Sequence, residues 1–131
     1  MKNNESKSEG YDYFDVTADI GFYAYGNSLD EAYENAGLAM FNVITDISKV
    51  KKDESREFEI VSEDLVSLLY DYLEELLFLQ DTEFLFFSDF KVNIEKIVDG
   101  ESSNLENYKL TCFACGEEID WNVHSPKSEV K

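Results

Sequence analysis

The segment Tyr13-Phe-Asp-Val-Thr-Ala-Asp-Ile-Gly-Phe-Tyr-Ala-Tyr-Gly26 decides the fold, because it predicts two short strands with a break between them. Apolar side chains recur at every second position in Ile20, Phe22 and Ala24. A period of two is typical of a β-strand, whose successive side chains point to opposite faces. The small residues Thr17-Ala18 interrupt the pattern, and we expect the chain to bend there.

Asp19 lies at this interruption, and aspartate is a poor strand residue. Its carboxylate could accept hydrogen bonds from backbone amides of the turn, or it could ligate a hard cation such as calcium. The residues alone leave both roles open. A small hydrolase built on Asp15 and Asp19 is a third possibility. On a regular strand these two residues would lie about 13 Å apart, which is too far for paired catalytic carboxylates.

The chain of 131 residues carries a formal net charge of −18 at pH 7 and is long enough for one domain with a core. Direct binding of nucleic acid requires a basic patch, whereas the eleven lysines and arginines are scattered along the chain. We therefore expect no direct binding of nucleic acid outside a complex. An acidic surface suits divalent cations, a basic protein partner, or solubility alone.

The composition also bears on location. No apolar run is long enough to cross a bilayer, so no membrane association is expected. Residues 1–10 are polar and lack the apolar centre of a secretory signal, and we predict a disordered N-terminal lead-in there. With two cysteines and no signal, the cytoplasm is the expected compartment.

Two helices are predicted from capping residues and helical periodicity. Ser28 and Glu31 form a capping-box pattern at the start of a helix over residues 29–43. Ser62 is the expected N-cap of a second helix. Its predicted apolar face comprises Leu65, Val66, Leu69, Tyr72, Leu73, Leu76 and Leu77.

Four further segments predict strands, over residues 56–61, 83–88, 90–98 and 108–115. Gly116-Glu117-Glu118 is expected to end the last of them. The order of strands and helices indicates an α+β single domain, with two helices packed on a largely antiparallel β-sheet.

Cys112 and Cys115 have the C-x-x-C spacing of redox and zinc motifs. On a strand, however, side chains three positions apart point to opposite faces, so the two sulfurs would not converge. Zinc usually takes four cysteine or histidine ligands, and His124 is the only histidine. We therefore interpret both cysteines as packing residues.

Three separated groups of residues together resemble the archease family. The groups are Asp15-Val-Thr-Ala-Asp-Ile-Gly21 with Tyr25-Gly26, then Glu31-Ala-Tyr-Glu-Asn-Ala36 with Ala39-Met-Phe41 and Thr45-Asp46, and finally Leu76-Leu-Phe-Leu79 with Phe87-Ser88 and residues 124–131. The similarity covers residues 11–131 in family order, which we treat as one archease-like domain.

The resemblance implies a role beside an RtcB-type RNA ligase, the enzyme that joins tRNA halves after intron removal. An archease-like cofactor would promote the metal- and GTP-dependent guanylylation of the ligase and its multiple turnover, without being an enzyme itself. Family members hold a divalent cation through the acid of the Thr-Ala-Asp motif, which is Asp19 here. Calcium is the first expectation, with magnesium or manganese as alternatives. The resemblance also places His124, Lys127 and Glu129 toward the ligase active site.

Two departures from the family pattern are visible. Val16 stands where many archeases have histidine, and the chain stops at Lys131, where the family continues into a further strand with an acidic metal ligand. We therefore expect that C-terminal strand to be lacking. The alternative function is a chaperone-like protein-binding module without metal dependence, which would use aromatic residues such as Tyr23, Tyr25 or Trp121.

Overall fold

The computed structural model describes residues 10–16, 19–98 and 106–124, and within them the side chains of residues 10–13, 24–97 and 107–124. Its elements are β1 (Tyr11–Val16), β2 (Asp19–Ala24), α1 (Leu29–Ile44), the 3₁₀ turn η2 (Ile47–Lys49), β3 (Glu54–Ser62), α2 (Leu65–Glu83), β4 (Leu85–Val98) and β5 (Glu106–Glu118).

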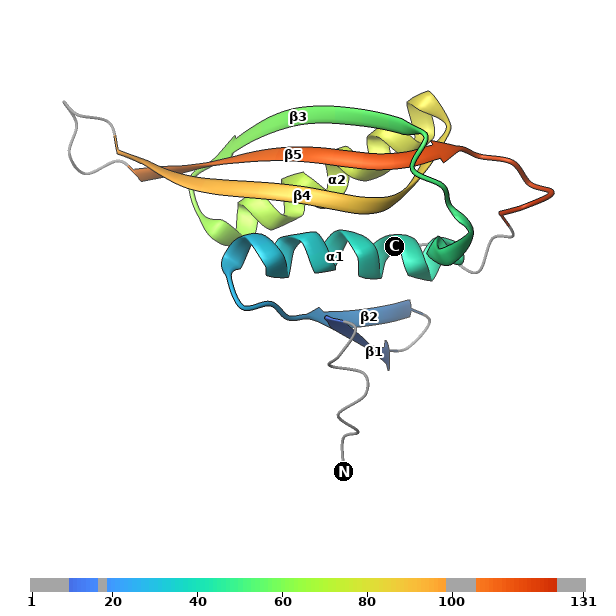
Figure 1. Ribbon diagram of the computed structural model, residues 1–131. Coiled ribbons are helices and arrows are strands. Elements are labelled where there is room, and N and C mark those ends of the chain that lie inside the picture. The colour runs from blue at the N-terminus through green and yellow to red at the C-terminus, as the bar shows by residue number, and fades with distance from the viewer. Residues whose placement is uncertain (1–9, 17–18, 99–105, 125–131) are drawn as a thin grey trace.

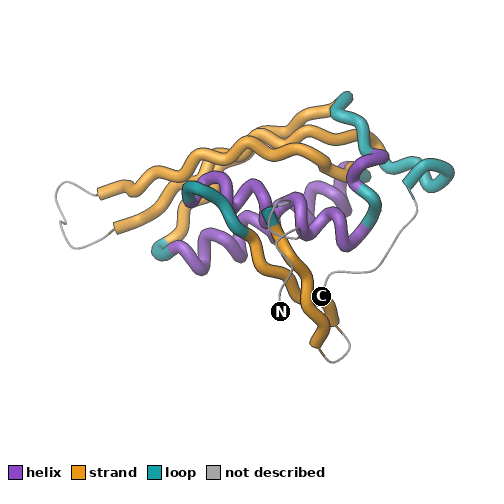
Figure 2. The backbone as a smooth tube through the Cα atoms, turned by 60° about the horizontal axis from the view of Figure 1, so that its bottom comes forward, coloured by secondary structure: helices purple, strands orange, loops and turns teal. Residues whose placement is uncertain are grey.

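The strands form two separate antiparallel units. One is a three-stranded sheet in the order β3-β5-β4, and the other is the β1–β2 hairpin. In Figure 1, α1 lies between the hairpin and the sheet. Figure 2 shows the hairpin extending away from the helices. The predicted fold class, two helices packed on an antiparallel sheet, is confirmed.

The predicted break in the first segment is also confirmed. Val16 pairs with Asp19 as the innermost pair of the β1–β2 hairpin. Two hydrogen bonds join the hairpin and the residue after it to α1. The Tyr13 hydroxyl donates to the Ala39 carbonyl at 2.7 Å, and the Asn35 side-chain amide donates to the Tyr25 carbonyl at 2.6 Å. The hairpin therefore depends on α1 for its position.

Helix α1 begins where its capping residues predict. The Ser28 hydroxyl accepts a hydrogen bond from the Glu31 backbone amide at 3.1 Å, which satisfies one of the free amides of the first turn. The Glu31 carboxylate accepts from the amide of Asn27, one residue earlier than in the usual capping box. The buried side of α1 includes Met40 and Phe41, which lie in the main core.

Helix α2 begins later than predicted. Its N-cap is Asp64, whose carboxylate accepts from the Ser67 amide at 2.8 Å, and the expectation that Ser62 caps this helix is wrong. Ser62 is the last residue of β3, where it pairs with Tyr108. Its hydroxyl donates to the Asp71 carboxylate at 2.8 Å and so joins the strand to the helix.

The apolar face of α2 is rotated relative to the prediction. Its buried residues are Leu68, Tyr72, Leu76 and Leu79. Val66, which we expected in the core, is 80% exposed, and that expectation is wrong. The other predicted residues that are not fully buried, Leu65, Leu69, Leu73 and Leu77, are partly buried and pack against the core, so that part of the prediction is confirmed. Within the described residues, neither helix has an apolar stretch suited to crossing a membrane.

Strand β4 corrects two further expectations. The segments expected as two strands form one strand, Leu85–Val98, with a bulge between Phe87 and Asp89. Gly116 does not end β5, which continues to Glu118. A Cβ atom on Gly116 would lie 1.8 Å from the Phe86 carbonyl oxygen, so only glycine permits this approach of two backbones beside the bulge.

The two cysteines occupy opposite faces of β5, as the spacing predicts. Cys112 is fully buried in the core, whereas Cys115 is only partly buried, and both are free thiols. Burial, together with the nearby carboxylate of Glu34, raises the pKa of the Cys112 thiol to about 12. Cys112 therefore stays protonated and acts as a packing residue, which confirms the interpretation for this side chain.

Carboxylates from α1 cover the outer edge of β4. Glu34 accepts a hydrogen bond from the Val92 amide at 2.8 Å, and Asp30 accepts from the Ile94 amide at 2.9 Å. Residues four apart on a helix lie one above the other, and amides two apart on a strand point the same way, so the two spacings match. Edge amides that would otherwise be open to another strand are thereby satisfied.

Candidate functional site

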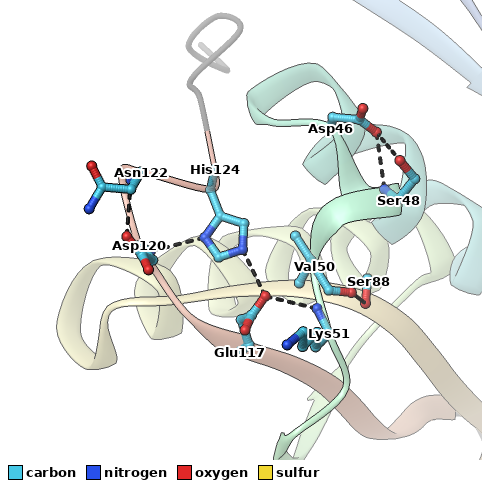
Figure 3. A network of polar contacts seen from close by, with 9 residues as sticks. All are labelled: Asp46, Ser48, Val50, Lys51, Ser88, Glu117, Asp120, Asn122 and His124. Atoms are coloured by element: carbon cyan, nitrogen blue, oxygen red, sulfur yellow. Dashed lines mark hydrogen bonds and ion pairs between the residues drawn. The ribbon is translucent and has the colours of Figure 1, made fainter.

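The most organised polar cluster of the described residues lies where β5 ends. There the chain turns over Asp120 to His124, and the His124 amide donates to the Asp120 carbonyl at 2.7 Å. The Asp120 carboxylate accepts from the Asn122 amide at 3.0 Å, as Figure 3 shows. An aspartate that binds the amide two residues ahead stabilises a turn, which explains the change of direction after the strand.

His124 is the centre of this cluster and is only 1% exposed. Its Nδ1 accepts a hydrogen bond from the Asp120 amide at 2.9 Å, and its Nε2 lies 2.8 Å from Oε1 of Glu117. The ring packs against Phe86 in a T-shaped arrangement, with ring centres 5.7 Å apart. Both nitrogens of the buried imidazole are therefore occupied by partners within the chain (Figure 3).

Glu117 joins three segments of the chain. The same carboxylate oxygen accepts from the Lys51 amide at 3.0 Å and from His124. The hydrogen bond from the Lys51 amide and the one from His124 hold the pKa of the Glu117 carboxyl below its usual range, against the opposing effect of desolvation. The segment before β3, the end of β5 and the terminal turn thus meet at one carboxylate.

A second hydrogen bond holds the segment before β3 in place. The Ser88 hydroxyl, at the bulge in β4, donates to the Val50 carbonyl at 3.0 Å. Upstream, the Asp46 carboxylate accepts from the backbone amide and the hydroxyl of Ser48, at 3.1 and 2.7 Å. Figure 3 shows these contacts beside the His124 cluster. The bulge therefore has a structural use, since it aims Ser88 at the loop that Glu117 also binds.

Next to this cluster is an acidic surface pocket of about 570 Å³. Its lining residues are Asp53, Glu54, Glu117, Glu118, Ile119, Asp120, Trp121 and Asn122. Trp121 is 55% exposed and packs edge-on against Phe84 and Phe86, with ring centres 6.1 Å apart in each case. A lining with five acids and no lysine or arginine attracts cations and repels phosphate groups.

Comparison with known proteins decides the family. A family model described as the archease protein family matches residues 11–131. The chain belongs to the archease family. The match covers the β1–β2 hairpin, both helices, the sheet and the His124 turn, so it is a property of the whole fold rather than of one motif.

Individual archeases are similar over most of their length. Protein archease from Methanothermobacter thermautotrophicus is 54% identical over 123 residues, which cover 94% of this chain and 82% of that protein. Protein archease from Pyrococcus abyssi is 49% identical, with 92% and 80% covered. The solution structure of Methanobacterium thermoautotrophicum protein 1598 matches with a TM-score of 0.72 at 49% identity, covering 94% of this chain and 82% of that one.

The residues expected to serve archease function fall into two groups. Asp19 opens β2 opposite Val16, and its side chain lies outside the described side chains. Lys127 and Glu129 also lie outside the described residues. His124 is described, and it lies in the interior of the turn rather than on an open surface.

The described side chains do not form a cation site by themselves. Among them, no three His, Cys, Asp or Glu residues are grouped so that they could hold a metal ion. Hard cations take six or more oxygen ligands. Asp19 as the ligand of a divalent cation accordingly stays a prediction.

Glu117 and the Lys51 amide were missed by sequence reasoning. Glu117 was expected only to help end a strand, and no role was predicted for the segment around Lys51. The signal that could have found the cluster is the pattern Asp120-x-Asn122-x-His124, an aspartate turn placed just before the single histidine.

The lowered pKa of Glu117 predicts a pH effect on stability. A carboxyl whose pKa is depressed in the folded state contributes stability above its unfolded pKa of about 4.3 and loses it as pH falls through the folded value. We expect Glu117→Gln to flatten the decline of the unfolding free energy between about pH 5 and about pH 3, measured by urea denaturation. Glu57→Gln, on the exposed face of β3, is the matched control and should leave the slope unchanged. Identical slopes for wild type and Glu117→Gln would contradict the assignment.

Proposed function

We propose that the protein is a cofactor that activates an RtcB-type RNA ligase in tRNA splicing. It would promote the metal- and GTP-dependent guanylylation of the ligase and its repeated turnover, and would not itself be an enzyme. The observation that carries the proposal is membership of the archease family over residues 11–131. The same proposal places the protein in the cytoplasm.

The charge of the chain supports this partner. A ligase must bind RNA and GTP, so its active-site cleft has to be basic, whereas this chain has a net charge of −18. The acidic pocket beside Trp121 concentrates that charge at the same end of the sheet as the His124 turn. Complementary charge favours docking on the ligase and disfavours direct binding to free RNA.

We also propose a divalent cation with Asp19 among its ligands. Calcium is the first choice, and magnesium or manganese are alternatives, because each takes carboxylate oxygens. The side chains described by the structure supply no rival cation site. This proposal adds no chemical step by the present chain, since guanylylation belongs to the ligase.

The test is a ligation assay with RNA substrate in excess over an RtcB-type ligase, with GTP and a divalent cation, and with or without this protein. We expect the protein to increase the number of joining events per ligase molecule. Bovine serum albumin, also an acidic protein, is the control for non-specific effects of charge. Unchanged turnover at saturating concentrations of the protein would overturn the proposal.

The ionic strength of the assay gives a further prediction. Contacts between exposed charges are screened over about 8 Å at 0.15 M salt, so raising salt from about 0.05 M to about 0.3 M should weaken binding to the ligase. Binding can be measured by calorimetry or by surface immobilisation of the ligase. Affinity that does not change with salt would show that charge complementarity contributes little.

The chaperone-like alternative predicts different behaviour. It has one favourable observation, the 55% exposure of Trp121. On that alternative, the protein should suppress aggregation of unrelated unfolded proteins equally well with calcium and with a chelator. The same preparations used in the ligation assay can be tested with heat-denatured clients, and Trp121→Ala should then reduce the protection.

A further inference from the structure

His124 has an unusual position for the single histidine of a very acidic chain. It is 1% exposed, and its ring packs against Phe86 of β4. Imidazoles are only intermediate in their tendency to be buried, and a buried polar group needs partners. Both ring nitrogens have such partners, and both partners belong to the segment 117–120 that precedes the histidine.

The pattern of donors determines the state of the ring. The Asp120 amide can only donate, so Nδ1 must be the unprotonated acceptor. The proton of the neutral ring therefore lies on Nε2, where it donates to the Glu117 carboxylate. A second proton on Nδ1 would remove the bond from the Asp120 amide, so the arrangement selects one neutral tautomer.

We propose that His124 is a positioning residue, which latches the terminal turn to the end of β5 as a neutral imidazole and does not contact the ligase itself. Through Glu117 the same latch reaches the Lys51 amide, so the turn is tied to the segment before β3 as well. His124 is the last residue that the structure describes, and residues 125–131 follow it directly. The latch fixes the point from which the segment with Lys127 and Glu129 starts. Its relevance to ligation rests on the proposed function above.

Direct contact between His124 and a partner conflicts with this geometry. The ring would have to give up the hydrogen bonds at 2.9 and 2.8 Å and its packing against Phe86. It would also leave the Glu117 carboxylate with only the Lys51 amide as a described partner.

Nuclear magnetic resonance can test the latch without the ligase. Because the sequence has one histidine, a long-range proton–nitrogen spectrum of the imidazole contains one spin system. At neutral pH we expect one protonated ring nitrogen, Nε2, and slow hydrogen exchange at the Asp120 amide. An Nδ1–H tautomer, or a ring that exchanges its proton as freely as a histidine peptide, would overturn the latch.

Substitutions separate the two hydrogen bonds. In His124→Asn the amide oxygen takes the place of Nδ1 and can accept from the Asp120 amide, whereas in His124→Gln the amide nitrogen takes the place of Nε2 and can donate to Glu117. His124→Ala removes both and should speed exchange of the Asp120 amide by about tenfold. We expect the asparagine variant to restore most of the protection. Asn122→Ala changes an exposed side chain in the same turn and is the matched control.

Ligase stimulation then tests the positioning role. We expect stimulation to fall about tenfold in His124→Ala, a loss of the size of one or two hydrogen bonds, and to recover partly in the two amide variants. Stimulation that stays at the wild-type level in His124→Ala would overturn the proposal. It would also be overturned if all three variants lost stimulation while protection of the Asp120 amide was retained, since that result indicates direct contact. If wild type itself fails to stimulate the ligase, the proposed function falls, and the spectra still decide the latch.

Discussion

Gly116→Ala is expected to destabilise the protein by about 3 kcal/mol or more, because the added methyl group meets a backbone atom rather than a movable side chain. A Cβ atom at this position would lie 1.8 Å from the Phe86 carbonyl oxygen and 2.8 Å from the Phe87 Cα. These contacts can be relieved only by moving β4 away from β5 next to the bulge. In thermal denaturation the expected shift of the midpoint is about 10 °C downward.

Cys115→Ala is the matched control for this substitution. Cys115 is the neighbour of Gly116 on β5, its side chain is only partly buried, and it pairs with Asp89 on the other side of the bulge. The control should change the free energy of unfolding by less than about 1 kcal/mol. If Gly116→Ala is as stable as the control, the two strands do not approach each other as closely as the structure indicates.

Asp19→Ala is expected to abolish the increase in ligase turnover while the fold remains intact. The proposal makes the Asp19 carboxylate a ligand of the divalent cation, and removing a charged oxygen ligand from a hard cation weakens its binding strongly. Asp19 pairs with Val16 next to the turn of the β1–β2 hairpin, which is separate from the three-stranded sheet, so little stability should be lost. Circular dichroism and thermal denaturation check the fold of the variant.

Cation binding needs its own measurement, because an acidic surface also attracts calcium without a specific site. Calcium titration can be followed through the backbone amide signals of β1 and β2 in wild type and in Asp19→Ala. Asp81→Asn, on an exposed position of α2, removes one charge elsewhere and serves as the control. Full stimulation of the ligase by Asp19→Ala, or equal calcium binding in the hairpin, would exclude Asp19 as a ligand.

The elements with local signals were predicted well. Helix α1 begins after Ser28 as expected. The serine N-cap and the acids of the first turn interact with backbone amides of the same turn, so the signal is contained in neighbouring residues. The break before Asp19 was also predicted, since a strand pattern with two small residues in its middle is a local feature. Both predictions depend on residues that are neighbours in the sequence.

The errors occurred where distant segments determine the structure. Ser62 is a good N-cap by type, but antiparallel pairing with Tyr108 keeps it in β3, and Asp64 takes the cap instead. Ser88 resembles a strand boundary because a bulge disturbs the alternation of side chains. Gly116 was interpreted as a strand end, although it is required by the approach of Phe86 from another strand.

The candidate site was predicted by residue type but not by arrangement. His124 was identified through its place in a family pattern, and an orientation toward a partner was inferred from that place. The structure shows a ring held by Glu117 and by the Asp120 amide, seven and four residues away. Such a contact depends on a turn whose geometry is set by Asp120, and no periodic pattern of the sequence encodes it.

The carboxylates of Asp30 and Glu34 make the two edges of the three-stranded sheet different from each other. A foreign strand approaching β4 would have to displace two side chains of α1 before it could form its first ladder contacts. At the opposite margin, β3 pairs only with β5 among the described strands. A peptide that extends this sheet is therefore expected to pair with β3 rather than with β4, where the two carboxylates already accept from the Val92 and Ile94 amides.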